Sequence, residues 1–153
     1  MTDQYLTFTL HDTLYAVPVS HVQEVLEYST PDQLPCTLDY IEGLISSRGH
    51  GIQVVNLCRK FGLVPSPVTK STRIVVLELK TPSEEDPDHV TIFGAVADSV
   101  EEVMEVNMDE LEPAPKFGNT ISSEFISGVG KKGEEFVILL DVDKIFHEDM
   151  LSA

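Results

Sequence analysis

The chain has 153 residues, 42% of them hydrophobic, which is enough for one ordinary domain with an apolar core. Its 26 acidic residues against 10 lysines and arginines give a formal charge of −16, which disfavours binding to nucleic-acid backbones and to anionic membrane surfaces. Because no apolar run reaches the roughly 18 residues of a membrane span and no secretory signal opens the chain, we expect a cytoplasmic protein.

Short apolar or alternating segments separated by turn residues follow one another along the chain. The first two, 5–10 and 14–19, flank a tight turn and predict a hairpin. Further strands are predicted at 22–27 (or a single helical turn), 52–57, 72–79, 90–96 and 136–142, and 40–45 is a short apolar segment. A short helix should end near Phe61–Gly62, and a terminal helix should span 143–150 with Asp143 as its N-cap. About eight to ten strands with few helices indicate an all-β fold of barrel or sandwich type.

The chain also contains an internal repeat. Residues 40–44 resemble 125–129 at an offset of 85, and the match continues from 52–57 onto 137–142. Upstream, 24–27 resembles 102–105 at an offset of 78, so seven additional residues fall in the second half, in the loop that contains Pro113 and Pro115. We therefore expect two related subdomains, at about 5–70 and 71–147, that pack together because each is marginal alone. A cleft between them could be lined by matched residues.

The sequence offers no recognisable catalytic chemistry. It contains no nucleophile elbow, phosphate-binding loop or His and Cys spacing of a metal site, so we expect neither an enzyme nor a cofactor or metal site. Arg48, one of only three arginines, lies in a glycine-flanked turn between apolar segments. It could present its guanidinium to a partner or form an internal salt bridge, and its position favours neither alternative.

A set of short elements is distributed along the chain: Phe8–Leu10, Tyr15–Val19 with Val22, Glu24–Leu26, Tyr40–Gly49, Val54–Leu57, Lys60–Gly62, Gly94–Val100, Ile126–Val129, and Leu140–Asp141 with Lys144–Ile145. Together these elements resemble the CheW family of bacterial chemotaxis coupling proteins, and the resemblance extends from about residue 5 to 147. Two departures are visible: Ser46 stands where the family usually has Asn, and His50–Gly51 replaces bulkier residues.

The resemblance implies a single domain, 1–153, with two five-stranded barrel-like subdomains, short helices including one at the C-terminus, and a possible exchange of a terminal strand. It also implies an adaptor that couples the cytoplasmic tip of a chemoreceptor to the regulatory domain of the histidine kinase CheA. Such a protein would be monomeric when free and would be recruited to receptor arrays, where it makes ring contacts. The expected receptor groove consists of Val19, Val22, Ala97, Val100 and Val103. The expected kinase contacts are Ile41, Leu44, Ile45 and Arg48.

Other functions remain as alternatives to this interpretation. A β-barrel interaction module outside chemotaxis would share the fold. A module that binds single-stranded nucleic acid needs a basic groove with stacking aromatics, which an acidic chain without tryptophan supplies poorly. A related adaptor with a receiver domain is disfavoured because 153 residues leave no room for one.

Overall fold

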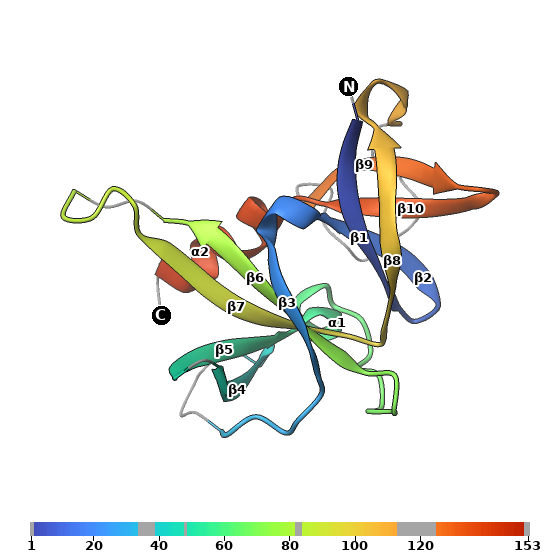
Figure 1. The fold of residues 1–153 in the computed structure, drawn as a ribbon. Helices are drawn as coiled ribbons and strands as arrows, with labels where there is room; N and C mark the ends of the chain where they lie inside the picture. The colour runs from blue at the N-terminus through green and yellow to red at the C-terminus, as the bar shows by residue number, and fades with distance from the viewer. Residues whose placement is uncertain (1, 34–38, 48, 82–83, 113–124, 152–153) are drawn as a thin grey trace.

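The computed structural model describes residues 2–33, 39–47, 49–81, 84–112 and 125–151 and is dominated by β-strands (Figure 1). The strands are β1 (Thr2–Leu10), β2 (Thr13–Pro18), β3 (Val22–Glu27), β4 (Ile41–Ser47), β5 (His50–Asn56), β6 (Arg73–Lys80), β7 (Val90–Ala97), β8 (Ser99–Asn107), β9 (Ile126–Lys132) and β10 (Glu135–Leu140). The helices are η1 (Val19–His21), α1 (Leu57–Lys60), η2 (Met108–Glu110) and α2 (Val142–Leu151). Arg48 and the Pro113–Pro115 loop lie outside the described residues. Within the described ranges, no helix is long and apolar enough to cross a membrane.

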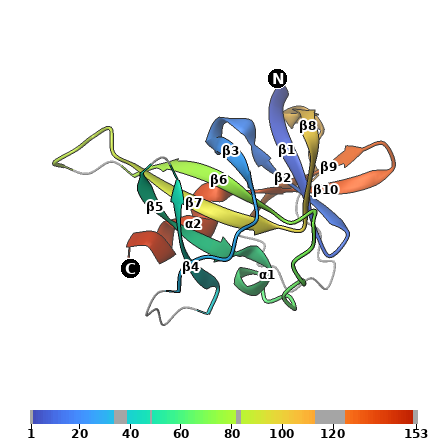
Figure 2. The same cartoon turned by 60° about the horizontal axis from the view of Figure 1, so that its bottom comes forward.

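The strands form two five-stranded sheets with equivalent topology. Sheet A has the order β8-β1-β2-β10-β9, and sheet B has the order β3-β6-β7-β5-β4. In Figure 2 the strands of sheet B occupy the left of the view and those of sheet A the right. The predicted all-β fold with two five-stranded, repeat-related units and short helices is therefore confirmed.

Each sheet combines strands from both halves of the sequence. The β1–β2 hairpin joins β8, β9 and β10 in sheet A, whereas the β6–β7 hairpin joins β3, β4 and β5 in sheet B. Each hairpin is attached on both sides: β1 pairs antiparallel with β8 and β2 parallel with β10, while β6 pairs antiparallel with β3 and β7 parallel with β5. Neither sheet is thus confined to 5–70 or 71–147, and what is exchanged is a two-stranded hairpin from each half. Two parallel neighbouring strands cannot be joined by a tight turn and require a long connecting segment.

The sheets curl but do not close into barrels by strand pairing. Instead, a short segment after one edge strand reaches the other edge by a single two-bond bridge. In sheet B, Asp32 and Leu44 exchange backbone hydrogen bonds of 2.8 Å in both directions. In sheet A, Glu112 and Val129 do the same at 3.0 and 2.9 Å. Leu44 and Val129 are matched residues at the offset of 85, so both halves of the repeat use the same device.

The glycine of the repeat makes room for this bridge. Gly43 has φ of +145°, and a Cβ there would lie 2.1 Å from the carbonyl oxygen of Asp32. At the matched Gly128, a Cβ would lie 3.2 Å from Leu111 and 3.5 Å from the Glu112 carbonyl oxygen. At position 43, any residue other than glycine would require a backbone shift. At position 128, an added Cβ could be accommodated by a movement of the flexible Leu111 side chain.

The matched Asn56 and Asp141 cap the helices that follow β5 and β10. The Asn56 side chain accepts a hydrogen bond from the Arg59 backbone N–H at 3.1 Å, and Asp141 accepts one from Lys144 at 3.2 Å. The expectation that Asp143 caps the terminal helix was wrong, because the helix begins at Val142 and Asp143 already lies in its first turn. The N-cap is the residue just before the helix whose side chain reaches the third helical N–H.

The core has three parts. Each sheet has an inner cluster of its own: Tyr5, Leu14, Ala16, Val106, Val137 and Leu139 in sheet A, and Ile45, Ile52, Val54, Ile74 and Val76 in sheet B. A larger shared core lies between the sheets and takes residues from both, together with both α-helices. Strand β6 is buried on both faces, with Ile74 in the inner cluster and Val75 in the shared core, which explains its continuous apolar sequence.

We predict that Gly43→Ala lowers the free energy of unfolding by about 3 kcal/mol or more, since it adds backbone strain to a steric clash with Asp32. The matched control is Gly133→Ala, a positive-φ turn position with open space around the added Cβ. Its cost should be about 1 kcal/mol. Urea denaturation of both variants checks the difference, and equal losses would show that the Asp32–Leu44 bridge does not depend on glycine.

Candidate protein-interaction surfaces

The edge strands β3 and β8 are equivalent elements of the repeat, related by the offset of 78. Both carry a one-residue bulge at the matched place. In β3, Val22 pairs with Leu77 and Glu24 with Val76, while in β8, Val100 pairs with Phe8 and Val103 with Leu6. A β-bulge increases the twist of a strand and changes the direction of its side chains. Because the bulges of β3 and β8 lie at equivalent positions, equivalent side chains of the two strands point in equivalent directions.

Four valines, which we call the edge valines, lie on the strand face that borders the shared core. They are Val22 and Val25 on β3 and Val100 and Val103 on β8. Val22 and Val100 are partly buried against the shared core, whereas Val25 is 39% and Val103 51% exposed. Each half of the repeat thus contributes one anchored and one exposed valine to the rim of the core.

The other two expected groove residues differ in accessibility. Val19 lies in η1 and is partly buried against the shared core. The matched Ala97 is fully buried at the end of β7, so its side chain presents no surface in this structure. Sequence reasoning omitted Val25 from the groove, although the offset of 78 that pairs it with Val103 was the signal that identifies it.

Strand β4 carries the expected kinase contacts that the structure describes. Ile41 and Leu44 are half-buried on this edge strand of sheet B. Ile45 is only 9% exposed and belongs to the inner cluster of that sheet. Ile41 and Leu44 therefore supply the accessible apolar surface of β4, and Ile45 anchors the strand from inside.

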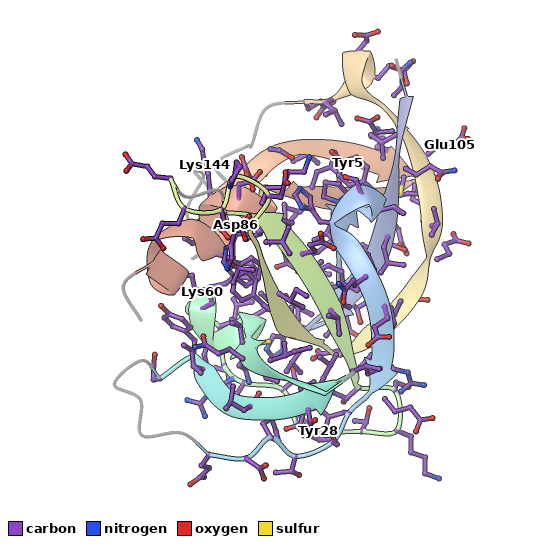
Figure 3. All side chains as sticks on the ribbon, turned by 60° about the vertical axis from the view of Figure 1, so that its left-hand side comes forward. Tyr5, Tyr28, Lys60, Asp86, Glu105 and Lys144 are labelled. Carbon is purple, nitrogen blue, oxygen red and sulfur yellow. The ribbon has the colours of Figure 1, made fainter. Side chains whose placement is uncertain are left out.

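The carboxylate of Glu42 fixes β4 to its neighbours. It accepts hydrogen bonds of 2.9 Å from the Tyr28 hydroxyl and of 2.9 Å from the Asn56 side-chain amide. Burial, reinforced by the hydrogen bond and charge of Glu42, raises the pKa of Tyr28 to about 12. Figure 3 shows Tyr28 at the end of the molecule opposite Glu105 on β8. The Glu42 contacts thus tie β4 to the segment after β3 and to the end of β5.

His11, Ser66 and Asp98 bring together the residue types of a hydrolytic triad, but in a different arrangement. The Ser66 hydroxyl donates to the Asp98 carboxylate at 2.8 Å, and the backbone N–H of His11 donates to the same oxygen at 2.9 Å. The imidazole of His11 contacts the Val64 carbonyl oxygen, so the acid does not orient the histidine as a base requires. Asp98 instead fastens the β1–β2 turn of sheet A to the segment that leads into sheet B.

Other polar sites give no indication of a bound metal or cofactor. Within the described part of the chain, no group of three or more His, Cys, Asp and Glu side chains could hold a metal ion. A cavity of about 540 Å³ beside Tyr28 and Glu42 also exposes Arg59, Asp39 and Asp98, a mixture of charges without a common target. Accessible apolar side chains lie on the edge strands β3, β4 and β8.

Comparison with known proteins agrees with this arrangement. The family model described as CheW-like domain matches residues 4–150. The chain is 27% identical to the chemotaxis protein CheW of Klebsiella aerogenes over 97% of this chain and 84% of that protein. It is 21% identical to the chemotaxis protein CheW of Bacillus subtilis over 96% of this chain and 88% of that protein. The crystal structure of the scaffolding protein TtCheW from Thermoanaerobacter tengcongensis superposes with a TM-score of 0.81 at 27% identity, covering 95% of this chain and 88% of that one.

We predict that Glu42→Gln lowers the pKa of Tyr28 from about 12 without returning it to 10, because burial is the larger cause of the shift. In the unaltered protein, Tyr28 contributes stability below pH 10 that is lost as the pH rises to about 12, since folding favours the neutral phenol. Ultraviolet titration of phenolate formation measures the shift, and Tyr28→Phe assigns it. An unchanged Tyr28 transition in Glu42→Gln would contradict this account.

Proposed function

The chain belongs to the CheW-like domain family of non-catalytic chemotaxis adaptors, and we propose that it couples a chemoreceptor to the histidine kinase CheA through two separate surfaces. The observation that carries the proposal is that accessible apolar side chains lie on different edge strands. The edge valines lie on β3 and β8 at the rim of the shared core, while Ile41 and Leu44 lie on β4, the last strand in the order of sheet B that begins with β3. An adaptor needs two such surfaces to hold two partners at once.

The edge valines form the proposed receptor surface. The cytoplasmic tip of a chemoreceptor is a helical hairpin, and an apolar groove between two structural units is a common docking place for a helix. Val25 and Val103 supply exposed apolar area, and Val22, Val100 and Val19 support it from the shared core. Ala97 has a structural role in this proposal, because its buried methyl group fills the core directly beneath the β7–β8 corner.

Strand β4 forms the proposed kinase surface. Ile41 and Leu44 present apolar side chains on an edge strand, and Arg48, which lies outside the described residues, follows β4 in the sequence. The regulatory domain of CheA is the proposed partner, with Ile45 holding β4 in place rather than touching the kinase. Contacts that are weak individually give a higher effective affinity when many adaptors are linked in an array. In this proposal the adaptor is a monomer when free and is recruited to the array.

We predict that Val25→Asp and Val103→Asp each weaken binding to a receptor cytoplasmic fragment at least tenfold, because the carboxylate is desolvated in the interface. The same variants should bind the CheA regulatory domain normally. Isothermal titration calorimetry with both partners measures this.

The reciprocal variants are Ile41→Glu and Arg48→Glu, which should weaken kinase binding and leave receptor binding unchanged. Val64→Asp is the matched control, because Val64 is 76% exposed in a loop that belongs to neither surface. Loss of both partners in every variant, with folding intact by circular dichroism, would show that one surface serves both. Failure of the unaltered protein to bind either partner would refute the proposed function.

A further inference from the structure

The corner between β7 and β8 is a place where the chain crosses from one sheet to the other. Sheet B consists of the consecutive strands β3 to β7, so among the described strands the chain crosses between the sheets twice. The first crossing is η1, and the second is the single residue Asp98, between Ala97 at the end of β7 and Ser99 at the start of β8. Figure 1 shows β7 leading into β8 at this sharp corner. The edge strand that carries Val100 and Val103 therefore leaves sheet B at Asp98.

Asp98 joins this corner to three other parts of the chain. Its carboxylate oxygen Oδ2 accepts hydrogen bonds from the Ser66 hydroxyl at 2.8 Å and from the backbone N–H of His11 at 2.9 Å. Its own backbone N–H donates to the carbonyl oxygen of Thr9 at 2.9 Å. Hydrogen bonds to a carboxylate are stronger than those between neutral groups. Asp98 thus fixes the corner to β1, to the β1–β2 turn and to the connection between α1 and β6.

The turn and the connection that bind Asp98 also contact each other. The turn residues His11 and Asp12 both have positive φ, 51° and 64°, as the hairpin turn of type I′ requires. The His11 imidazole contacts the carbonyl oxygen of Val64 and lies 3.5 Å from the Ser66 hydroxyl. The Asp98 carboxylate therefore binds two donors that other contacts already hold in place.

The first two pairs of β8 with β1 lie next to this cluster. Thr9 pairs with Ser99 and Phe8 with Val100, after which the bulge interrupts the register. The Thr9 and Ser99 hydroxyls also share a hydrogen bond of 2.7 Å. Because only two pairs lie between the corner and the bulge, the position of Val100 depends on how the corner is held.

We propose that Asp98 is a positioning residue of the receptor surface, which holds the β7–β8 corner so that Val100 and Val103 stay at the rim of the shared core. It acts through these valines and does not contact the receptor. This inference rests on the proposed receptor surface and adds the residue that orders its β8 part. The matched residue of the first crossing, Ser20, has no carboxylate, so the two crossings are supported differently. Without the Asp98 carboxylate, two donors lose their acceptor, and the freed corner must be ordered when the receptor binds, which lowers the affinity.

The variant Asp98→Ala tests this role by isothermal titration calorimetry with a receptor cytoplasmic fragment and with the CheA regulatory domain. Receptor affinity should fall about tenfold, while kinase affinity should be unchanged because β4 lies outside the cluster. Asp98→Asn keeps a side-chain oxygen as acceptor and should recover part of the loss. The matched control is Asp88→Ala, which removes the same charge from the exposed β6–β7 loop and should leave both affinities unchanged.

A double-mutant cycle with Val103→Ala separates positioning from direct contact. If Asp98 acts through the edge valines, Asp98→Ala should cost about threefold less receptor affinity in the Val103→Ala background than in the unaltered protein. Amide hydrogen exchange should also be faster in 99–103 of Asp98→Ala, and unchanged in 41–47.

Three results would overturn the inference: additive losses in the cycle, unaltered receptor affinity in Asp98→Ala, or an equal loss of kinase binding in that variant. Additive losses would mean that Asp98 acts independently of the valines, and an equal loss of kinase binding that it supports the whole fold. The proposed function fails separately, since in that case the unaltered protein does not bind the receptor fragment or Val103→Asp leaves the binding intact.

Discussion

Aromatic rings from both sheets meet in an apolar layer that belongs to neither sheet alone. Phe8 stacks on Tyr15 with 6.0 Å between the ring centroids, and Tyr15 stacks on Phe61 with 6.2 Å between theirs. Phe93 of sheet B stacks on Phe146 of the terminal helix with a centroid separation of 5.1 Å. Because each half of the chain also lends a hairpin to the other sheet, neither sheet can form without both halves. The positions of the edge strands, and hence of both proposed surfaces, depend on this shared layer.

The repeat places equivalent features at the two edges of that layer. Matched bulges, matched valines and matched glutamates occur on β3 and β8, and matched bridges support β4 and β9. Equivalent edges are not identical in composition, since the one charged residue within β4 is Glu42, whereas β9 ends in Lys131 and Lys132. A pseudo-symmetric scaffold of this kind can therefore hold different partners on surfaces that share one geometry.

Features that depend on residues close in sequence were predicted better than features that depend on contacts between distant segments. The offset of 85 identified Gly43 and Asn56 as repeat positions, and both perform local tasks, a close backbone approach and a helix cap. Strand β8 was not predicted as a strand, because its bulge breaks the alternation. The hairpin exchange has no local signature, since it depends on contacts between distant segments. Burial of Ala97 and Ile45 follows from that exchange and from the curl of sheet B, which single-residue patterns do not encode.

Amide hydrogen exchange of the full chain, alone and with each partner, tests the existence of two separate surfaces most directly. The account predicts that a receptor fragment slows exchange in 19–27 and 98–106, whereas the CheA regulatory domain slows exchange in 41–53. With both partners present, both sets of segments should be protected together. Protection of the same segments by either partner, or displacement of one partner by the other, would contradict an adaptor that holds both at once.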